Sequence, residues 1–490
     1  MKIKLEGSFD ASVKFFFEDQ LDSLEKNYYD YFEKTKVFSG KKDEIYCLVG
    51  PNEQEVFVGL GKADESTLQI LRKQSYALGK SLKEHKISSA GIEVMDFKSK
   101  TNNRDFCALK AVDAIVEGLL QSAYRFDKYV EKTEDEEINI VLQVREGYEE
   151  KAKRSIEETS NLMEGVFLTR DLVNTPSNDM YPETLAKAAT EKLSTVGVHV
   201  KIYGKKQIEE MGMEAFLSVA RGSAKEPQFI VMEYLPVEGQ QPMAIVGKGL
   251  TYDSGGYAIK PASGMVTMKC DMGGAASVIG TLYALGLNKV KKNVVGVVAA
   301  CENMISGDAY KNGDIISSMK GSTIEILNTD AEGRVTLADS LYYAATKIDP
   351  EVIIDLATLT GAAIVAVGEQ STILISNDDE WANRVEKAGD DMGEYMVRLP
   401  MNEELREAVK GDVSTVKNSV SSGGGGSITA GIFLEHFVEK KPWVHMDIAG
   451  PAYSSSAYSY LPKYATGIPV KTLYKTIFDQ SSSKIDMEEL

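Results

Sequence analysis

The chain has 490 residues, enough for about two or three domains with large cores. Its 43% hydrophobic and 26% charged residues are typical of a globular protein in water. The 73 acidic residues outnumber the 55 lysines and arginines, and the net charge of -18 argues against general binding to nucleic acid.

Cysteine usage and the chain start bear on the compartment. Four widely spaced cysteines fit neither a zinc-finger spacing nor a disulfide framework, so we interpret them as reduced thiols. The N-terminal Met-Lys-Ile-Lys-Leu-Glu lacks the apolar core of a secretory signal. No apolar run approaches the roughly 20 residues needed to span a bilayer. We therefore expect a cytoplasmic protein with no membrane partner.

Residues 1–150 predict a small N-terminal α/β domain with short strands and amphipathic helices. A hairpin is predicted where two strand-like runs flank Pro51-Asn52-Glu53. The predicted elements, in order, are strands Glu44–Gly50 and Glu55–Leu60, helix Glu65–His85, strand Ala90–Val94, helix Cys107–Tyr124, strand Ile138–Val144 and helix Tyr148–Thr169. The last helix falls largely in residues 151–174, which we interpret as a linking helix.

Residues 175–490 repeat a pattern of apolar strand, glycine turn and helix. Most strands are continuously apolar and rich in valine and isoleucine, as expected of parallel strands that are covered on both faces. Buried strands are predicted at Met243–Val246, Asn293–Ala299, Thr323–Leu327, Val352–Leu356, Thr372–Ser376 and Val444–Ile448, with helices such as Ala275–Leu285 and Leu337–Lys347 between them. The pattern predicts a second α/β domain, a doubly wound mixed sheet flanked by helices.

Polar motifs follow several of these strands directly. They are Lys248–Asp253, Glu302-Asn303, Asn328–Arg334 and Ala357–Gly361. In open α/β sheets, ligands bind in the crevice at the carboxyl ends of the strands. We therefore expect these separate segments to converge on one pocket.

Four carboxylates in this region predict a metal centre. Asp253, Asp271, Asp330 and Glu332 would repel one another in a pocket unless cations neutralised them, and two divalent ions would balance their charge. Any one aspartate alone would be read as a helix cap or turn former, but the set favours metal binding. The chain has only four histidines and no His-Glu-x-x-His pair, which argues against a mononuclear zinc protease. Oxygen ligands suit magnesium, manganese or zinc.

Three basic residues accompany the carboxylates. Lys248 is either a structural ion pair or a metal ligand in its neutral form, which requires a lowered pKa. Lys260, held before Pro261, is placed to stay charged and polarise a substrate carbonyl. Arg334, near a helix start, offers a planar fork for an anion. For both of these a surface salt bridge is the alternative. Ser419–Ser427, rich in glycine, is either a flexible linker or a mobile loop over the pocket.

Several of these motifs together resemble the leucyl aminopeptidase family of cytosolic two-metal aminopeptidases. The heptapeptide Asn-Thr-Asp-Ala-Glu-Gly-Arg at 328–334 is highly specific to that family. The resemblance covers essentially all of residues 165–475 and is weaker at Glu117-Gly-Leu-Leu and Tyr124. The matching segments are Arg170–Asn178, Val246–Gly256, Met268–Ala276, Asn328–Arg334, Asp355–Gly361 and His445–Gly450.

The resemblance implies a macro-like N-terminal domain, a catalytic domain over 175–490, and a role for each site residue. Asp253 and Glu332 would bridge two divalent ions, zinc or manganese. Lys248 and Asp271 would complete a tight site, and Asp330 an exchangeable one. Lys260 and Arg334 would be catalytic, with Arg334 holding a bicarbonate ion as general base. Substrate contacts would come from Met268, Asn328, Thr358, Leu359, Gly361 and Ala449.

The resemblance also implies a homohexamer and leaves the side-chain preference open. Tyr252 replaces the usual phenylalanine, and the stretch after Gly450, which borders the specificity pocket, diverges from the family pattern.

The predicted reaction is hydrolysis of the N-terminal residue, with a leucine-like preference, from peptides with a free N-terminus. A metal-bound α-amine would explain the exopeptidase specificity, and a water activated by two metals would attack the carbonyl. One alternative keeps the metals but makes the protein a cysteinyl-glycine dipeptidase or an amidase. Another is a non-catalytic DNA-binding or scaffold protein, against which the intact ligand set and the negative net charge argue.

Overall fold

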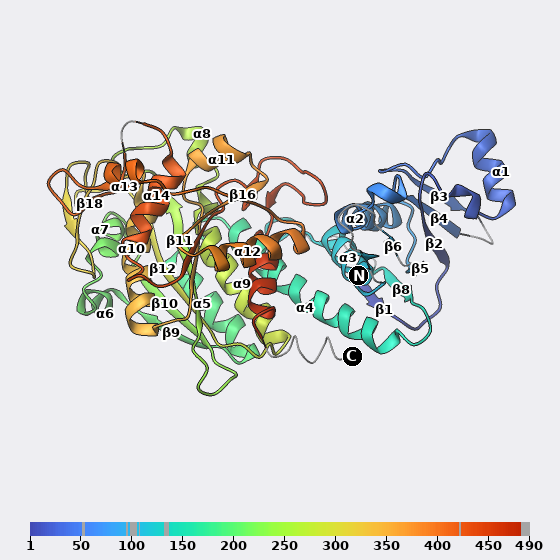
Figure 1. Ribbon diagram of the computed structural model, residues 1–490, viewed down its shortest axis with the longest axis horizontal. Coiled ribbons are helices and arrows are strands. Elements are labelled where there is room, and N and C mark those ends of the chain that lie inside the picture. The colour runs from blue at the N-terminus through green and yellow to red at the C-terminus, as the bar shows by residue number, and fades with distance from the viewer. Residues whose placement is uncertain are drawn as a thin grey trace. The chain divides into compact units, whose positions relative to one another are not determined.

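The computed structural model describes residues 1–50, 54–94, 97–98, 105–106, 108–131, 137–420 and 423–481 (Figure 1). The chain divides into two compact units. The first comprises Met1–Met163 with Ala457–Leu461, and the second comprises Glu164–Ser456 with Pro462–Leu490. Helix α4, Glu149–Asn174, contains the point of division.

The first unit is built on a six-stranded sheet within the described residues. Its order is β1-β8-β5-β2-β4-β3, and every neighbouring pair is parallel except β3 and β4. The strands are β1 Lys2–Lys4, β2 Ala11–Phe16, β3 Ile45–Val49, β4 Gln54–Gly59, β5 Ser89–Glu93 and β8 Asn139–Gln143, with a separate ribbon of β6 Phe97–Lys98 and β7 Asp105–Phe106. The predicted antiparallel pairing of the hairpin is confirmed, and its turn at 51–53 lies outside the described residues.

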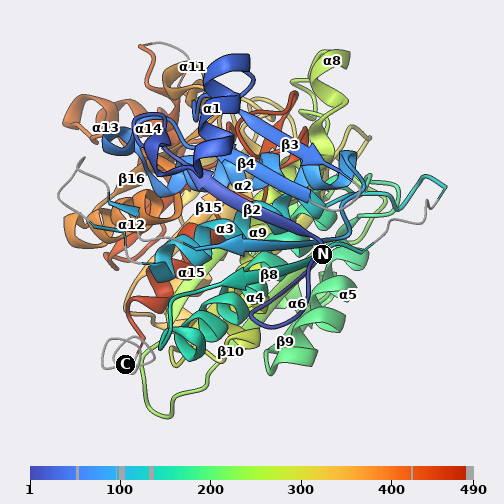
Figure 2. The same ribbon diagram turned by 90° about the vertical axis from the view of Figure 1, so that its right-hand side faces the viewer.

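Helices of the first unit confirm the predicted amphipathic segments. Strand β2 alternates buried and half-buried residues, and its buried Val13 and Phe15 belong to the same core cluster as Leu78 of α2 and Leu119 of α3. The helices are α1 Lys26–Thr35, α2 Leu68–Glu84 and α3 Ala108–Ala123, with short turns η1 Leu21–Ser23 and η2 Ala63–Glu65. Figure 2 labels strands β2, β4 and β8 and helices α2 and α3 of this unit.

The second unit is built on an eight-stranded mixed sheet within the described residues, in the order β17-β16-β19-β15-β11-β12-β10-β9. Its inner strands β19, β15, β11 and β12 are all parallel, whereas β16, β10 and β9 introduce antiparallel pairs. The strands are β9 His199–Tyr203, β10 Gln228–Tyr234, β11 Met243–Asp253, β12 Val294–Asn303, β15 Ile353–Ala357, β16 Ser371–Ser376, β17 Tyr395–Arg398 and β19 Trp443–Asp447. The predicted fold class is confirmed.

Helices cover both faces of this sheet. On one face, α9 packs so closely that a Cβ on Gly247 would lie 2.7 Å from Ala275 N. On the other, Leu337 of α10 and Phe433 of α14 share a core cluster with Val246 and Val297. The helices are α5 Pro182–Leu193, α6 Lys205–Glu210, α7 Glu214–Ala220, α8 Ala262–Met265, α9 Gly273–Leu287, α10 Glu332–Tyr343, α11 Gly361–Val367, α12 Asp379–Met392, α13 Glu403–Val409, α14 Gly426–Glu435 and α15 Val470–Phe478, with short turns η3 Ser194–Val196, η4 Met268–Met272 and the π-turn η5 Ala344–Ile348.

The stretch Met268–Leu287, which contains η4 and α9, is the one described segment long and apolar enough to cross a membrane by composition. Its most apolar window is 89% buried inside the fold. That burial is expected of a core helix packed on a sheet.

Three strand predictions need correction. The strand predicted at Thr323–Leu327 is β14, Thr323–Glu325, and it pairs with β13 (Ile315–Ser317) and β18 (Val416–Lys417) in a separate three-stranded sheet. Its residues are apolar enough for a central strand, but pairing partners depend on tertiary structure. Strands β11 and β12 both run further than predicted, to Asp253 and Asn303, because their ladder continues past a bulge at Leu250/Tyr252.

The glycine-rich segment gives way to a helix earlier than predicted, since α14 already begins at Gly426. Before it, Gly423, Gly424 and Gly425 have φ values of 94°, 74° and 68°, which side chains other than glycine rarely adopt. Residues 421–422 of this predicted linker or loop lie outside the described residues.

A buried polar pair joins two inner strands of the second unit. His445 Nδ1 on β19 lies 2.7 Å from Asp355 Oδ1 on β15, and Trp443 Nε1 donates a hydrogen bond of 2.6 Å to Asp355 Oδ2. Burial by itself would lower the pKa of His445, but the Asp355 carboxylate outweighs it and raises that pKa above its ordinary 6.5.

Candidate metal centre

Strand β11 and helix α10 bring the first basic residue of the site into the core. Lys248, 3% exposed, points from the middle of β11 towards the first turn of α10. A Cβ added to Gly333 in that turn would lie 2.4 Å from Lys248 Cε. Only glycine at this position allows the helix to approach the lysine so closely.

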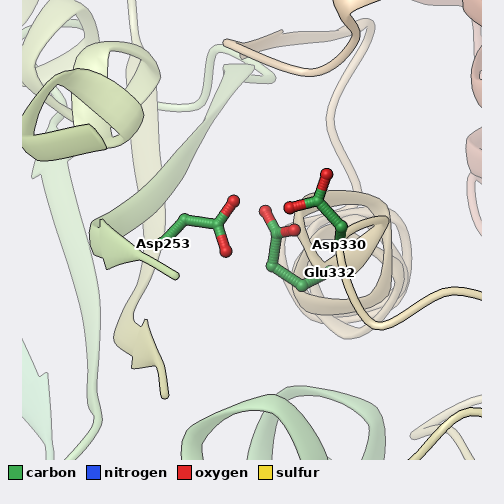
Figure 3. A group of neighbouring side chains, drawn as sticks. All are labelled: Asp253, Asp330 and Glu332. Carbon is green, nitrogen blue, oxygen red and sulfur yellow. The ribbon is translucent and has the colours of Figure 1, made fainter. Parts of the chain in front are cut away.

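The four predicted carboxylates come from four separate places in the second unit. Asp253 ends β11, Asp271 lies in η4, Asp330 precedes α10, and Glu332 begins it. One oxygen from each of Asp253, Asp330 and Glu332 falls within 4.8 Å of the others, and Figure 3 shows the three side chains pointing towards one another. The structure therefore gathers segments that the sequence separates by up to 79 residues.

Two lysine ammonium groups lie between these carboxylates. Lys248 Nζ is 2.8 Å from Asp271 Oδ2 and 2.9 Å from Glu332 Oε1. Lys260 Nζ is 2.8 Å from Asp253 Oδ2 and 2.5 Å from Asp330 Oδ1. Lys260 is thus paired inside the cluster rather than at the surface. Four carboxylates against two ammonium groups leave two negative charges uncompensated.

The pKa values of the carboxylates reflect this excess. Burial, with repulsion from Asp253, raises the pKa of Glu332 to about 8. Burial also raises the pKa of Asp271 to about 6, although Lys248 opposes the shift. Burial raises the pKa of Asp330 too. For Lys248, burial favours the neutral amine, but Asp271 and Glu332 outweigh it and raise the pKa above its ordinary value. Among these carboxylates Lys248 is therefore a charged, buried ion pair, and it would bind a metal only after losing its proton, which a nearby dication favours.

This donor set fits divalent cations. Glu332 Oε2 is buried and accepts no hydrogen bond from any described residue. Buried carboxylate oxygens without donors, together with a local excess of negative charge, are costly unless a cation shares the site. Hard oxygen ligands with one lysine nitrogen nearby are compatible with magnesium, manganese or zinc.

A side chain from the Glu302-Asn303 motif, which was expected near the pocket without a stated role, orients Asp253. Asn303, fully buried at the end of β12, donates hydrogen bonds from Nδ2 to Asp253 Oδ1 (2.8 Å) and to the Thr329 carbonyl (3.0 Å). Its position directly after the apolar run of β12 was the available signal. Asn303 therefore ties the end of β11 to the segment that carries Asp330.

Four of the six predicted substrate residues fall into two groups. Thr358 contacts the carboxylate cluster directly, because its carbonyl accepts a bond from Lys248 Nζ (2.9 Å) and its Oγ1 donates to Asp271 Oδ1 (2.7 Å). Asn328 also belongs here, since its Oδ1 accepts the backbone N–H of Asp330 at 2.9 Å.

The second group gathers around Asp447, a fully buried carboxylate at the end of β19 that sequence reasoning did not assign. Its Oδ1 accepts the backbone N–H groups of Leu359 (3.1 Å) and Ala449 (3.2 Å). Within the described ranges, no hydrogen bond or ion pair joins the side chain of Met268, or Gly361, to the cluster. A Cβ on Gly361 would meet open space.

Arg334 lies in the first turn of α10 with only 9% of its surface exposed. Its side chain makes no hydrogen bond or ion pair in the part of the chain that the structure describes, and its Nε is buried without a partner. Burial lowers the pKa of Arg334 to about 10, although Glu332 and Asp447 oppose the shift. The surface salt bridge considered as an alternative is not formed, and the guanidinium is available to an anion.

Comparisons with known proteins agree with this geometry. Residues 167–474 match the catalytic domain of the cytosol aminopeptidase family, and residues 8–133 match its N-terminal domain. Probable cytosol aminopeptidases of Treponema denticola and Clostridium tetani are each 48% identical, covering 92% and 91% of this chain and 95% and 92% of their own.

Solved structures agree as well. A mutant of tomato leucine aminopeptidase superposes with a TM-score of 0.86 at 31% identity, over 98% of this chain and 96% of its own. The bottromycin maturation enzyme BotP in complex with Mn superposes with a TM-score of 0.85 at 29% identity, over 96% of this chain and 100% of its own. The chain therefore belongs to the cytosol aminopeptidase family and is a metal-dependent peptidase.

Proposed function

We propose that the protein is a two-metal aminopeptidase that removes the N-terminal residue, with a leucine-like preference, from peptides with a free N-terminus. The observation that carries the proposal is the cluster of Asp253, Asp330 and Glu332, with one oxygen of each within 4.8 Å of the others. Asp271, joined to Glu332 through Lys248, extends it to a four-carboxylate set with room for two dications by charge.

Two observations support the proposed metal ligands: the family resemblance, and the close grouping of these residues in the structure. Asp253 and Glu332 would be shared by both ions, Lys248 and Asp271 would complete one site, and Asp330 the other. Two zinc or manganese ions, when bound, would supply Lewis acidity and lower the pKa of a water. The manganese in the BotP complex supports manganese as one candidate.

The chain's own residues would bind and orient the substrate. Lys260, which is 17% exposed and paired to Asp253 and Asp330, would donate to the substrate carbonyl oxygen and stabilise its developing charge. Arg334, whose buried guanidinium has no partner among the described residues, would hold bicarbonate, and this anion would supply a general base.

The loops around the cluster would receive the peptide. Thr358 and Leu359 precede α11, and Asn328, Met268, Gly361 and Ala449 lie on neighbouring segments. The open space at Gly361 is compatible with a bulky substrate side chain. The names of the relatives support a cytoplasmic location, and the family resemblance supports a homohexamer.

A substrate panel on chelated and reconstituted protein tests the proposal. We expect leucine p-nitroanilide to be cleaved only after Mn²⁺ or Zn²⁺ is restored, and its N-acetylated form not to be cleaved at all. Glu332→Ala and Asp330→Ala should abolish turnover while the fold survives. Activity that is indifferent to chelation, or retained in both variants, would contradict the proposal. Preferential cleavage of cysteinyl-glycine or of simple amides would instead support the alternative activities.

A further inference from the structure

A buried asparagine outside the predicted site forms hydrogen bonds with the backbone of the loop that contains Asp330. Asn418 follows β18 and is 0% exposed. Its Oδ1 accepts the backbone N–H groups of Leu327 (2.9 Å) and Asn328 (3.3 Å). Its Nδ2 donates to the carbonyls of Asn328 (2.7 Å) and Ala331 (3.3 Å). One carboxamide therefore holds both ends of the 327–331 loop.

This loop lies between a short strand and a helix, and it needs such support. It contains Asp330, whose side chain is 34% exposed and therefore the least buried of the four carboxylates. On its other side, Thr329 Oγ1 donates to the Gly255 carbonyl at 2.8 Å, and Thr329 N–H donates to Asn312 Oδ1 at 3.1 Å. Asn418 thus completes a set of bonds that fixes the loop backbone around Asp330.

We propose that Asn418 is a positioning residue for the metal centre. By holding the 327–331 loop, it keeps the Asp330 carboxylate beside Asp253 and Glu332. The inference rests on the proposed function, since it assigns Asn418 to the site that Asp330 completes. Residues that orient a metal ligand typically change metal affinity by roughly 10–100-fold when removed.

The chemistry of the contacts requires an amide. Asn418 both accepts from two N–H groups and donates to two carbonyls, and no carboxylate can do both. Asn418→Asp keeps the shape and the acceptor, but it turns an oxygen towards the carbonyls of Asn328 and Ala331. Asn418→Ala removes all four bonds. Both changes should therefore loosen the loop, and the aspartate variant retains the packing if the alanine variant folds poorly.

Asn293 provides a matched control at the end of the eight-stranded sheet opposite to the carboxylates. It is 3% exposed, and its carboxamide likewise holds a loop, accepting from Val237 N–H (2.9 Å) and donating to the carbonyls of Val237 (2.6 Å) and Gln240 (2.9 Å). It precedes β12, whereas the site lies at the other end of that strand, about 30 Å away. Asn293→Ala removes comparable bonds far from the carboxylates.

Mn²⁺ binding to the chelated full-length protein tests the inference without relying on turnover. Free Mn²⁺ is followed by electron paramagnetic resonance, and thermal stability is measured alongside. We expect Asn293→Ala to bind two ions, each with the same affinity as in wild type. In both Asn418 variants the weaker of the two sites should lose roughly 10–100-fold in affinity.

The outcomes separate the two proposals. If the Asn418 variants bind Mn²⁺ as tightly as Asn293→Ala at similar thermal stability, Asn418 only supports the fold and the inference is wrong. If wild type itself binds fewer than two ions, the two-metal proposal fails, independently of Asn418.

Discussion

Replacing Gly333 with alanine should disable the site through a single methyl group. The added Cβ would lie 2.4 Å from Lys248 Cε, about 1 Å closer than an ordinary contact. Lys248 is enclosed in the core, so its ammonium must move with the side chain. A shift of about 1 Å would stretch its bonds to Asp271, Glu332 and the Thr358 carbonyl from 2.8–2.9 Å to beyond hydrogen-bonding distance.

The expected cost combines three effects. Overpacking costs about 1–3 kcal/mol, and separating a buried ion pair costs up to about 3–5 kcal/mol. Alanine recovers about 1 kcal/mol of helix propensity over glycine. When the ion pair separates fully, we therefore expect the free energy of unfolding to fall by about 3–7 kcal/mol. A displacement of about 1 Å at a catalytic site lowers kcat/KM by roughly 100-fold.

Hydrolysis of leucine p-nitroanilide after Mn²⁺ reconstitution measures the effect, with denaturant unfolding alongside. Gly431→Ala is the matched control, because its Cβ in α14 would lie 2.8 Å from Ile375 side-chain atoms instead of a site residue. It should lower stability and leave kcat/KM unchanged. If Gly333→Ala kept the kcat/KM and the Mn²⁺ affinity of wild type, the reasoning would be refuted, because α10 could then move away from Lys248 without disturbing the site.

Three further predictions concern residues around the cluster. Asn303→Ala removes the 2.8 Å bond that orients Asp253, so the Mn²⁺ concentration for half-maximal activity should rise roughly 10–100-fold in a metal titration. Asp447→Ala frees the loops it holds, and we expect kcat/KM in steady-state assays to fall roughly 100-fold. Asp355 raises the pKa of His445, so the stability from this pair is full below pH 6.5 and is lost as pH rises through the folded-state value. Calorimetry should show a steeper decline in wild type than in Asp355→Asn, in which buried carboxyls with raised pKa such as Glu332 still contribute; equal declines in the two proteins would exclude the pair as a source.

Much of the secondary structure followed from local pattern. Strand β12, for example, is an apolar run from Val294 to Cys301, and the alternation of such strands with helices indicates a covered sheet. The sequence was less informative where the pattern is weak. Strand β9 lies at the sheet edge and has no buried residue, and β17 spans only four residues, so neither shows the apolar pattern of a buried strand.

The ends of some strands could also not be predicted from the local sequence pattern. Lys248 and Asp253 read as turn residues because polar side chains and glycines interrupt the apolar run. They lie within β11 because its ladder with β12 continues around them and because ion pairs compensate the buried charges. The pairing of β14 with β13 and β18, instead of with the central sheet, likewise depends on partners distant in the chain.

The chemistry of the site could be predicted from the sequence. Four carboxylates and two lysines in short motifs indicate a cation site, and the motifs resemble those of one family. Residue type and order determine that much, because charge and donor atoms are properties of single side chains. Tertiary structure alone decided which further polar groups hold those side chains in place. Asn303, Asp447 and Asn418 bond to segments as many as 91 residues away in the chain. Their position after a strand does not reveal these partners, because folding brings the partners together.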